Sequence, residues 1–283
     1  MAGASMKDIK LRIKSVESTM QITKAMQLVA TSKLRRAKER MENSKPYTRI
    51  AQEAISAAVM SCEDTTVPFV TPREVKRRCY VVIAGDRGLA GGYNANIFKA
   101  VSAHAEGVEY CVLPMGRKAA ERFHRLGIET LTDGVLRVEG ATVGNCYKLA
   151  EMLIDGYQKE QFDEVWLVFT SFQSMLSQEV QVDQLLPIAK PEDSEAARTP
   201  VSTVYELSAA ETIEKVMPDF LAGRLYSALC DSFASEVSAR RTAMDSATKN
   251  AGEMIADLTL KYNRARQGAI TQEITEIVAG AEQ

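Results

Sequence analysis

Four glycines in the stretch GDRGLAGGYN, residues 85–94, are the first candidate for chemistry in this 283-residue chain. The stretch follows the apolar run CYVVIA and precedes a helical pattern, and strand, glycine turn and helix is the order in which many proteins cradle a phosphate. Its spacing fits neither the dinucleotide fingerprint G-x-G-x-x-G nor the P-loop G-x-x-x-x-G-K-[ST]. A structural turn is therefore favoured, with glycines supplying positive φ and close backbone approach and with Asp86 or Asn94 capping a helix. Nucleotide binding stays open as the alternative.

Other reactive groups give no pattern of a catalytic or metal site. The chain lacks a G-x-S-x-G elbow and an H-E-x-x-H motif, and it has two histidines. The five cysteines are scattered without C-x-x-C spacing, so we expect reduced thiols, no catalytic residue, no metal and no cofactor. The start MAGASMKDIK has no apolar signal core, and no run approaches about 20 apolar residues, so neither export nor direct membrane insertion is expected. The cysteines are Cys62, Cys79, Cys111, Cys146 and Cys230.

Residues 1–60 are predicted to form a coiled-coil helix over residues 5–60, with a kink or break at Pro46. Its apolar positions alternate steps of four and three, the 3.5-residue repeat of a left-handed coiled coil. Around residues 22–31 apolar groups lie nearly all round the helix, which predicts that the helix is enclosed on every side. The seam residues are Ile9, Ile13, Val16, Met20, Thr23, Gln27, Ala30, Leu34, Ala37 and Met41.

Residues 205–283 repeat this pattern, with no proline after Pro218. About 65 residues of helix would span about 100 Å at about 1.5 Å per residue, whereas a globule of this chain length is roughly 50 Å across. Two long terminal helices are therefore expected to pair as an antiparallel coiled coil that protrudes as a rod. The seam residues are Val237, Arg240, Met244, Ala247, Ala251, Met254 and Leu258.

The middle of the chain, residues 75–190, is predicted to be an α/β domain, Rossmann-like with a mostly parallel sheet, because short Val-rich runs alternate with helical patterns. Residues 178–187 alternate like an edge strand, and residues 189–200 form a polar loop bounded by prolines. The expected buried strands are 79–84, 108–114 and 164–170, and the helices lie near 90–104, 116–125 and 141–159.

Charge is unevenly distributed along a chain of net charge −2. Residues 1–60 carry 12 Lys and Arg against 5 Asp and Glu, while residues 205–283 carry 8 against 12. The run SKLRRAKER, residues 32–40, has three possible interpretations. A solvated helix face is favoured, and a docking surface for an acidic protein partner is the second choice. A nucleic-acid site is the least favoured, because no aromatic residue interleaves with the charges of the run. No nucleic-acid partner is expected.

The sequence contains three distinctive blocks, IKSVESTMQITKAMQLVATSKLRRA (13–37), DRGLAGGYNANIF (86–98) and YNRARQGAITQEITEIVAGA (262–281). Together they resemble the gamma subunit of the rotary F-type ATP synthase, and the resemblance covers nearly the whole chain in one order. Ala90 stands where the family commonly has a cysteine. The loop at 189–200 is short and holds no cysteine pair, so the thiol switch of the chloroplast form is expected to be absent; with no transit peptide, a bacterial form is expected.

The resemblance implies a non-catalytic rotor shaft with its nucleotide sites on partner chains. The two long helices would lie inside a ring of three alpha and three beta subunits. The α/β domain would sit below, with the epsilon subunit, on the membrane ring of c subunits. Proton flow would turn the ring and the shaft, which would drive each beta site through open, loose and tight states during ATP synthesis or hydrolysis. The protein would be peripheral, at the cytoplasmic face of the bacterial cell membrane.

The resemblance also implies roles for individual residues. Residues 266–280 have apolar groups in a region without a core of its own, and they are expected to be polar on one face and apolar on the other. The implied catch on a beta-subunit loop is Arg266, Gln267, Thr271 and Glu273, and the implied bearing tip is Ile270, Ile274, Ile277 and Val278. The implied shaft and coupling positions are Met26 and Arg240, with Lys24, Lys33, Arg35 and Arg36 facing an acidic lever of the beta subunits.

Two other classes of function stay open beside the shaft. One is a Rossmann-like nucleotide-binding enzyme with helical arms for dimerisation, which would bind nucleotide at residues 85–94. The other is a static coiled-coil scaffold, which would tolerate exchange of its seam residues.

Overall fold

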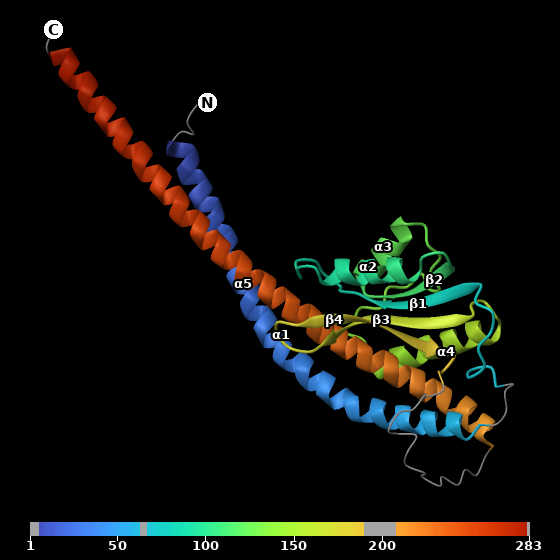
Figure 1. Cartoon of the computed structure of the whole chain (residues 1–283). Helices are drawn as coiled ribbons and strands as arrows, with labels where there is room; N and C mark the ends of the chain where they lie inside the picture. The colour runs from blue at the N-terminus through green and yellow to red at the C-terminus, as the bar shows by residue number, and fades with distance from the viewer. Residues whose placement is uncertain (1–5, 63–66, 190–207, 282–283) are drawn as a thin grey trace. The chain divides into compact units, whose positions relative to one another are not determined.

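The computed structural model describes residues 6–62, 67–189 and 208–281, as five helices and four strands (Figure 1). Most of the predicted loop at 189–200 lies outside the described residues. The helices are α1 (Met6–Met60), α2 (Tyr93–His104), α3 (Arg117–Arg125), α4 (Val143–Gln158) and α5 (Ala209–Ala281); the strands are β1 (Arg77–Ile83), β2 (Glu109–Met115), β3 (Glu164–Phe172) and β4 (Gln178–Leu186).

The chain divides into two compact units. The coiled-coil unit comprises Met1–Thr31 with Arg240–Gln283, and the base unit comprises Ser32–Ala239. Helices α1 and α5 each contribute residues to both units. Within the base unit, their segments pack on the sheet as part of one hydrophobic core, through residues such as Ile55, Val59 and Leu221.

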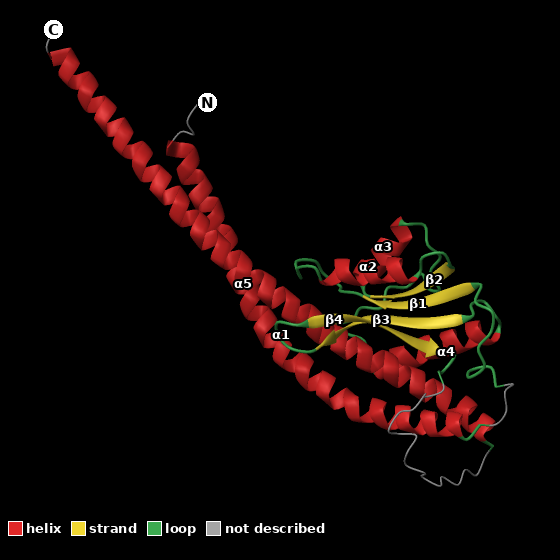
Figure 2. Cartoon of the chain, in the orientation of Figure 1, coloured by secondary structure: helices red, strands yellow, loops and turns green. Residues whose placement is uncertain are grey.

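The base unit holds a four-stranded sheet in the order β2-β1-β3-β4 (Figure 2). Strand β1 is parallel to both β2 and β3, and β4 is antiparallel to β3 at the edge. The predicted α/β class, the mostly parallel sheet and the edge strand are therefore confirmed. The buried Val-rich strands form because both faces of the sheet are covered.

Side chains of the central strand alternate between two cores. Cys79 and Val81 of β1 point into the core formed with α4, α5 and the end of α1, whereas Tyr80 and Val82 point into the core formed with α2 and α3. Helix α4 begins at a capping box in which Thr142 and Asn145 bond each other's backbone N–H. Helices on both faces make this a doubly wound sheet.

Helix α1 runs unbroken from Met6 to Met60 and includes Pro46, so the break that the sequence allowed at this residue does not occur. Pro46 itself is exposed. The next residue, Tyr47, packs so closely on Gly223 of α5 that a Cβ at Gly223 would lie 2.6 Å from the ring. Tertiary packing of the flanking turn therefore holds the helix together.

The coiled-coil unit is antiparallel, as predicted. The Thr23 and Thr248 hydroxyls are 2.8 Å apart, Gln27 Nε2 donates to Asp245 Oδ1 at 2.8 Å, and Arg241 donates to the Thr31 hydroxyl at 3.3 Å. Residue numbers rise along α1 while they fall along α5. The predicted seam of α1 is confirmed, since each of its members is buried or half-buried.

The predicted seam of α5 departs from the structure at one position, Met254, while Arg240 and Ala247 are half-buried as members of a seam are expected to be. Val237, Met244, Ala251 and Leu258 are buried as expected, but Met254 is 46% exposed and its neighbour Ile255 is turned inward. Thr248, beside the half-buried Ala247, also contacts α1 through the Thr23 hydroxyl. A heptad repeat can step from a seam position by three or by four residues; from Ala251 the step of four reaches the half-buried Ile255, whereas the predicted step of three reaches the exposed Met254.

Candidate functional site

The end of α5 in the coiled-coil unit carries every residue of the implied catch and tip, and all eight side chains are exposed. The register of the three interhelical hydrogen bonds places Met6, the first described residue of α1, beside about Arg266. Beyond that point α5 continues to Ala281 past the described start of α1 (Figure 1). The tip therefore has no described neighbour in its own chain.

The catch and tip side chains share one half of the helix, and Gln272, Thr275 and Glu276 lie on the opposite half, so the apolar face also carries the polar catch residues. Successive residues turn by about 100°, which sorts the eight into two adjacent stripes. Each stripe combines two polar and two apolar residues. Thr271 lies over the Gln267 carbonyl and donates to it at 2.9 Å. The stripes are Arg266, Ile270, Glu273 and Ile277, and Gln267, Thr271, Ile274 and Val278.

The outer face of α1 in the coiled-coil unit is also apolar and uncovered by this chain. Leu11, Ile22 and Val29 fall on one stripe of the helix and are 56–61% exposed. Met26 is half-buried between this face and the seam, and Lys24 is exposed. The predicted enclosure of residues 22–31 is therefore not supplied by α5. Ser15 and Ser18 interrupt the stripe between Leu11 and Ile22, so its exposed apolar groups are concentrated around residues 22–29.

The basic residues of the run at 32–40 do not act as one free surface. Lys33 pairs with Glu139 of the base unit, and Lys38 lies 4.9 Å above the Phe172 ring. Arg40 donates to the Tyr226 hydroxyl at 3.0 Å and to the Ala141 carbonyl. Arg35 and Arg36 are exposed. These two are thus exposed basic residues of the run, whereas Lys33, Lys38 and Arg40 contact residues of the base unit.

The glycine loop is built as a turn. Gly91 has φ +57 and Leu89 has φ +60, so positive φ is required at one glycine and also at a leucine. Asn94 is not the N-cap of α2, which is Gly92; its Oδ1 accepts from Gly85 N at 2.9 Å. Asp86 accepts from Arg117 N, the first residue of α3, at 3.2 Å. Neither Asp86 nor Asn94 is therefore an N-cap residue, because the N-caps of α2 and α3 are Gly92 and Gly116. Asp86 instead accepts from the first backbone N–H of α3 from outside that helix.

The crevice where a doubly wound sheet usually binds its ligand lies at the carboxyl ends of β1 and β3, since β2 and β3 flank β1 on opposite sides. Helix α5 occupies it. The Ser232 hydroxyl lies 3.4 Å from both the Ile83 carbonyl and Thr170 N, and Ser235 Oγ donates to the Thr170 carbonyl at 3.1 Å. The Tyr93 hydroxyl adds a bond of 2.6 Å to Ser232 Oγ. A nucleotide at this crevice would have to displace α5.

Sequence reasoning missed this set of α5 residues. Ser232, Ser235, Glu236 and Ser238 are 0–2% exposed, which is unusual for polar side chains. Serines at steps of three within a long helix were the available signal. Their partners are more than 60 residues away in the sequence, so the signal did not say what they bind.

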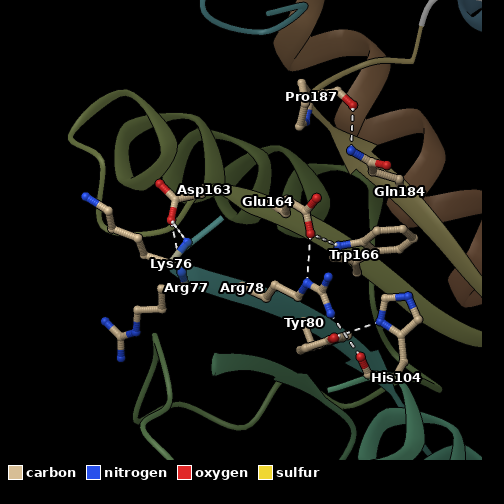
Figure 3. Close-up of polar contacts among 10 residues, drawn as sticks. All are labelled: Lys76, Arg77, Arg78, Tyr80, His104, Asp163, Glu164, Trp166, Gln184 and Pro187. Carbon is tan, nitrogen blue, oxygen red and sulfur yellow. Dashed lines mark hydrogen bonds and ion pairs between the residues drawn. The ribbon is translucent and has the colours of Figure 1, made fainter. Parts of the chain in front are cut away.

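A second polar cluster lies at the opposite ends of the same strands (Figure 3). Glu164 Oε2 accepts from Arg78 Nε at 2.8 Å and from Trp166 Nε1 at 2.9 Å, while Tyr80 bonds His104 Nδ1 at 2.8 Å. Burial, together with the Arg78 guanidinium, lowers the pKa of His104. Burial also raises the pKa of Tyr80. These groups satisfy one another and hold β1, β3 and the end of α2 together.

A cleft of about 770 Å³ adjoins this cluster. Arg73 lines it, but its guanidinium already pairs with Asp163 at 3.2 Å and stacks 4.2 Å from the Tyr157 ring centroid. Asp163 in turn accepts from the backbone N–H groups of Lys76 and Arg77 at 2.8 and 2.9 Å (Figure 3). The charged groups of the cleft are engaged in structure, so we assign it no chemistry.

All five cysteines are buried free thiols. Cys79 and Cys111 are paired in register across β1 and β2. Burial raises the pKa of Cys79, and its hydrogen bond to Cys111 lowers the pKa of that second thiol. Burial also raises the pKa of Cys146 to about 12. Among residues 6–62, 67–189 and 208–281, no cluster of three metal-ligating side chains occurs.

None of the helices in the described part of the chain has the length and apolar content needed to cross a bilayer. This finding concerns α1 and α5 above all, since only their lengths exceed what a span requires.

Comparison with known proteins identifies the family. The ATP synthase family model matches residues 5–283. The ATP synthase gamma chain of Ruminococcus albus is 45% identical over 280 residues, which are 97% of this chain and 96% of that protein. The gamma chain of Alkaliphilus metalliredigens is 41% identical over 285 residues, 99% of each.

A solved structure shares the fold. A chain in the OSCP/F1/c-ring part of the Euglena gracilis mitochondrial ATP synthase superimposes with a TM-score of 0.70 at 16% identity, covering 98% of this chain and 93% of that one. The expected resemblance is thereby confirmed over the whole length, and the chain belongs to the ATP synthase gamma chain family.

Proposed function

We propose that this chain is the non-catalytic rotor shaft of an ATP synthase, seated within three alpha and three beta subunits. Its base would rest with the epsilon subunit on the c-ring, at the cytoplasmic face of the cell membrane, as a peripheral protein. Residues 1–60 and 205–283 would form the shaft, and residues 75–190 its base. The observation that carries the proposal is the exposed end of α5, where polar and apolar side chains share one half of a helix without a neighbour in the chain.

The four polar residues at this end are proposed to form the catch on a beta-subunit loop. To move a two-state site from 1:99 to 99:1, the shaft must favour one state by about 5.5 kcal/mol. Charge-assisted hydrogen bonds contribute about 1.5–3 kcal/mol each, so a few from Arg266, Gln267, Thr271 and Glu273 suffice. All four side chains are exposed, so their polar groups are accessible to a partner chain.

The apolar residues interleaved with the catch are proposed to form the bearing. Apolar contact is non-directional and gives little preference for one angle over another. The four apolar tip residues are 46–72% exposed, and Leu11, Ile22 and Val29 on the outer face of α1 are exposed to a similar extent. The tip residues are Ile270, Ile274, Ile277 and Val278. A surrounding apolar sleeve would cover both while the shaft turns.

The coupling positions fall into two groups. Met26 and Arg240 lie in the coiled-coil unit, and we propose that they contact the ring around the shaft. Lys24, Arg35 and Arg36 are exposed and are proposed to face acidic groups of the beta subunits. Lys33 would have to exchange its ion pair with Glu139 for such a contact. Its contribution is therefore expected to be smaller than theirs.

Co-purification tests the assembly. The tagged full-length chain should bring down three alpha and three beta subunits for each copy of itself, and the complex should hydrolyse ATP while the isolated chain neither binds nor hydrolyses it. Tight ATP binding by the isolated chain would favour the nucleotide-binding enzyme, which would have to use the 85–94 loop. Intact coupled synthesis without the chain would overturn the shaft.

Truncation tests the tip. A chain ending after Arg266 lacks the bearing residues and most of the catch but keeps the described pairing of α1 and α5. Assembly with weakened torque is the expected result. Failure to assemble would make this end an anchor, and unchanged torque would contradict the roles proposed for it.

A further inference from the structure

Glu236 of α5 is a charged side chain in the interior of the base unit. It is 2% exposed. Its carboxyl group lies against Gly85, the first glycine of the loop that follows β1: a Cβ built on Gly85 would be 2.8 Å from both Cδ and Oε1 of Glu236. Gly85 is not among the residues with positive φ, so what favours glycine there is the close approach of the end of the Glu236 side chain rather than the backbone conformation.

The same stretch of α5 is fixed by hydrogen bonds one turn away. Ser232 and Ser235 bond the backbone of β1 and β3 at Ile83 and Thr170, and Tyr93 bonds Ser232 from α2. Residues 232 and 236 are separated by one helical turn, so both point to the same side of α5, toward the carboxyl ends of the strands. The glycine turn and these strand ends together form one receiving surface for the helix.

Most of the remaining contact between α5 and the sheet is apolar, through residues such as Met217, Leu221, Leu225 and Leu229. Apolar contact favours burial but does not by itself fix a helix in one rotation about its axis. Hydrogen bonds and a side chain seated in a fitted space do, because a rotated helix would leave buried polar groups unpaired. Burying a carboxylate costs free energy, and in some proteins such a group is retained because it specifies one packing arrangement of the elements around it.

We propose that the Gly85 turn is a socket in which Glu236 keys helix α5 to the sheet, and that this joint passes the turning of the base into the shaft helix. The inference rests on the proposed rotor function. It assigns the glycine loop a ligand, the carboxyl group of the chain's own helix. The joint lies three residues before Ala239, where the base unit ends, and α5 continues as one helix into the coiled-coil unit.

The test uses the complete ATP synthase complex, in which ATP hydrolysis and ion pumping are measured on the same vesicles. The wild-type chain must first restore pumping to complexes that lack it; failure here would sink the rotor function itself. Gly85→Ala, which fills the socket, and Glu236→Ala, which empties it, are each expected to retain hydrolysis and to lose ions pumped per ATP hydrolysed. Gly88→Ala is the matched control, because a Cβ there meets nothing within 4 Å, and it is expected to pump normally.

Two further variants separate a joint from a merely structural contact. Glu236→Gln keeps the shape of the key and is expected to pump better than Glu236→Ala. The double variant Gly85→Ala with Glu236→Ala removes the clash, so it should assemble better than Gly85→Ala and still pump poorly. Normal pumping per ATP in assembled Glu236→Ala complexes would overturn the proposal. So would failure of both single variants to assemble while Glu236→Gln is normal, because the contact would then serve stability alone.

Discussion

The base unit and the free end of α5 use the same residue types in opposite ways. In the base, the leucine, isoleucine and valine side chains of the sheet core are buried, and carboxylates such as Glu164 and Asp163 are paired with Arg78 and Arg73. At the end of α5, the isoleucines and the charged Arg266 and Glu273 all face outward. The same residue types serve internal stability in the base, whereas at the end of α5 we propose that they contact other chains. The free energy of unfolding of the isolated chain should therefore distinguish the two regions.

The largest difference is expected between a buried and an exposed apolar residue. Leu167 on β3 is 0% exposed, so Leu167→Ala should lower the free energy of unfolding by about 2–5 kcal/mol through lost burial and a cavity. Ile274→Ala, with 57% of the residue exposed, should change it by about 0.5 kcal/mol or less. Urea unfolding of the two full-length variants measures both. Comparable losses would mean that the end of α5 is packed in the isolated chain.

Charged residues should show the same contrast at a smaller scale. Glu164→Ala leaves the donors of Arg78 and Trp166 without their acceptor and should cost about 1–3 kcal/mol (Figure 3). Asp257→Ala removes only the exposed pair with Lys261 in the coiled-coil unit and should cost about 0.5 kcal/mol or less. The same urea titration, followed by the fluorescence of the single tryptophan, compares the first variant with its control. A loss at Asp257 as large as that at Glu164 would contradict the contrast.

Within the coiled-coil unit, the corrected seam gives a sharper comparison. Ile255 is turned toward α1 and Met254 is not, so Ile255→Ala should destabilise the pairing by about 1 kcal/mol more than Met254→Ala. Because the end of a coiled coil opens locally, amide hydrogen exchange of residues 9–20 is the suitable measurement. Faster exchange in Met254→Ala than in Ile255→Ala would restore the seam expected from sequence.

The strands and helices could be predicted from the sequence because their signals are local. The Val-rich run at 164–170 and the alternation at 178–187 are complete within a few residues, and the structure has β3 and β4 there. The seam of α5 was ambiguous because steps of three and of four from Ala251 both suit the repeat. Only the pairing with α1, distant in the sequence, leaves Ile255 half-buried and Met254 exposed.

The functional residues likewise divide into those that a local sequence pattern reveals and those that only a long-range contact reveals. The glycine loop could be recognised as a turn from spacing alone, but its occupant could not, since Glu236 lies 151 residues after Gly85 and no local pattern links them. The catch and tip were proposed from a resemblance, and their exposure agrees with a surface that binds partners. Their interleaving on one half of the helix follows from helical geometry, and it means that a partner meets polar and apolar groups together.

The smallest expected effect concerns pH in the base unit. Burial and Arg78 lower the pKa of His104, so the folded chain binds a proton there less readily than the unfolded chain does. The associated stability is present above the unfolded histidine pKa of about 6.5 and is lost as pH falls through the lower pKa of the folded state. The His104 ring centroid lies 4.3 Å from that of Trp166, so tryptophan fluorescence should titrate with a midpoint below about 6.5 and lose this step in His104→Gln. A midpoint above that value, or an unchanged titration in the variant, would mean that the cluster of Tyr80, His104 and Glu164 does not hold the imidazole neutral.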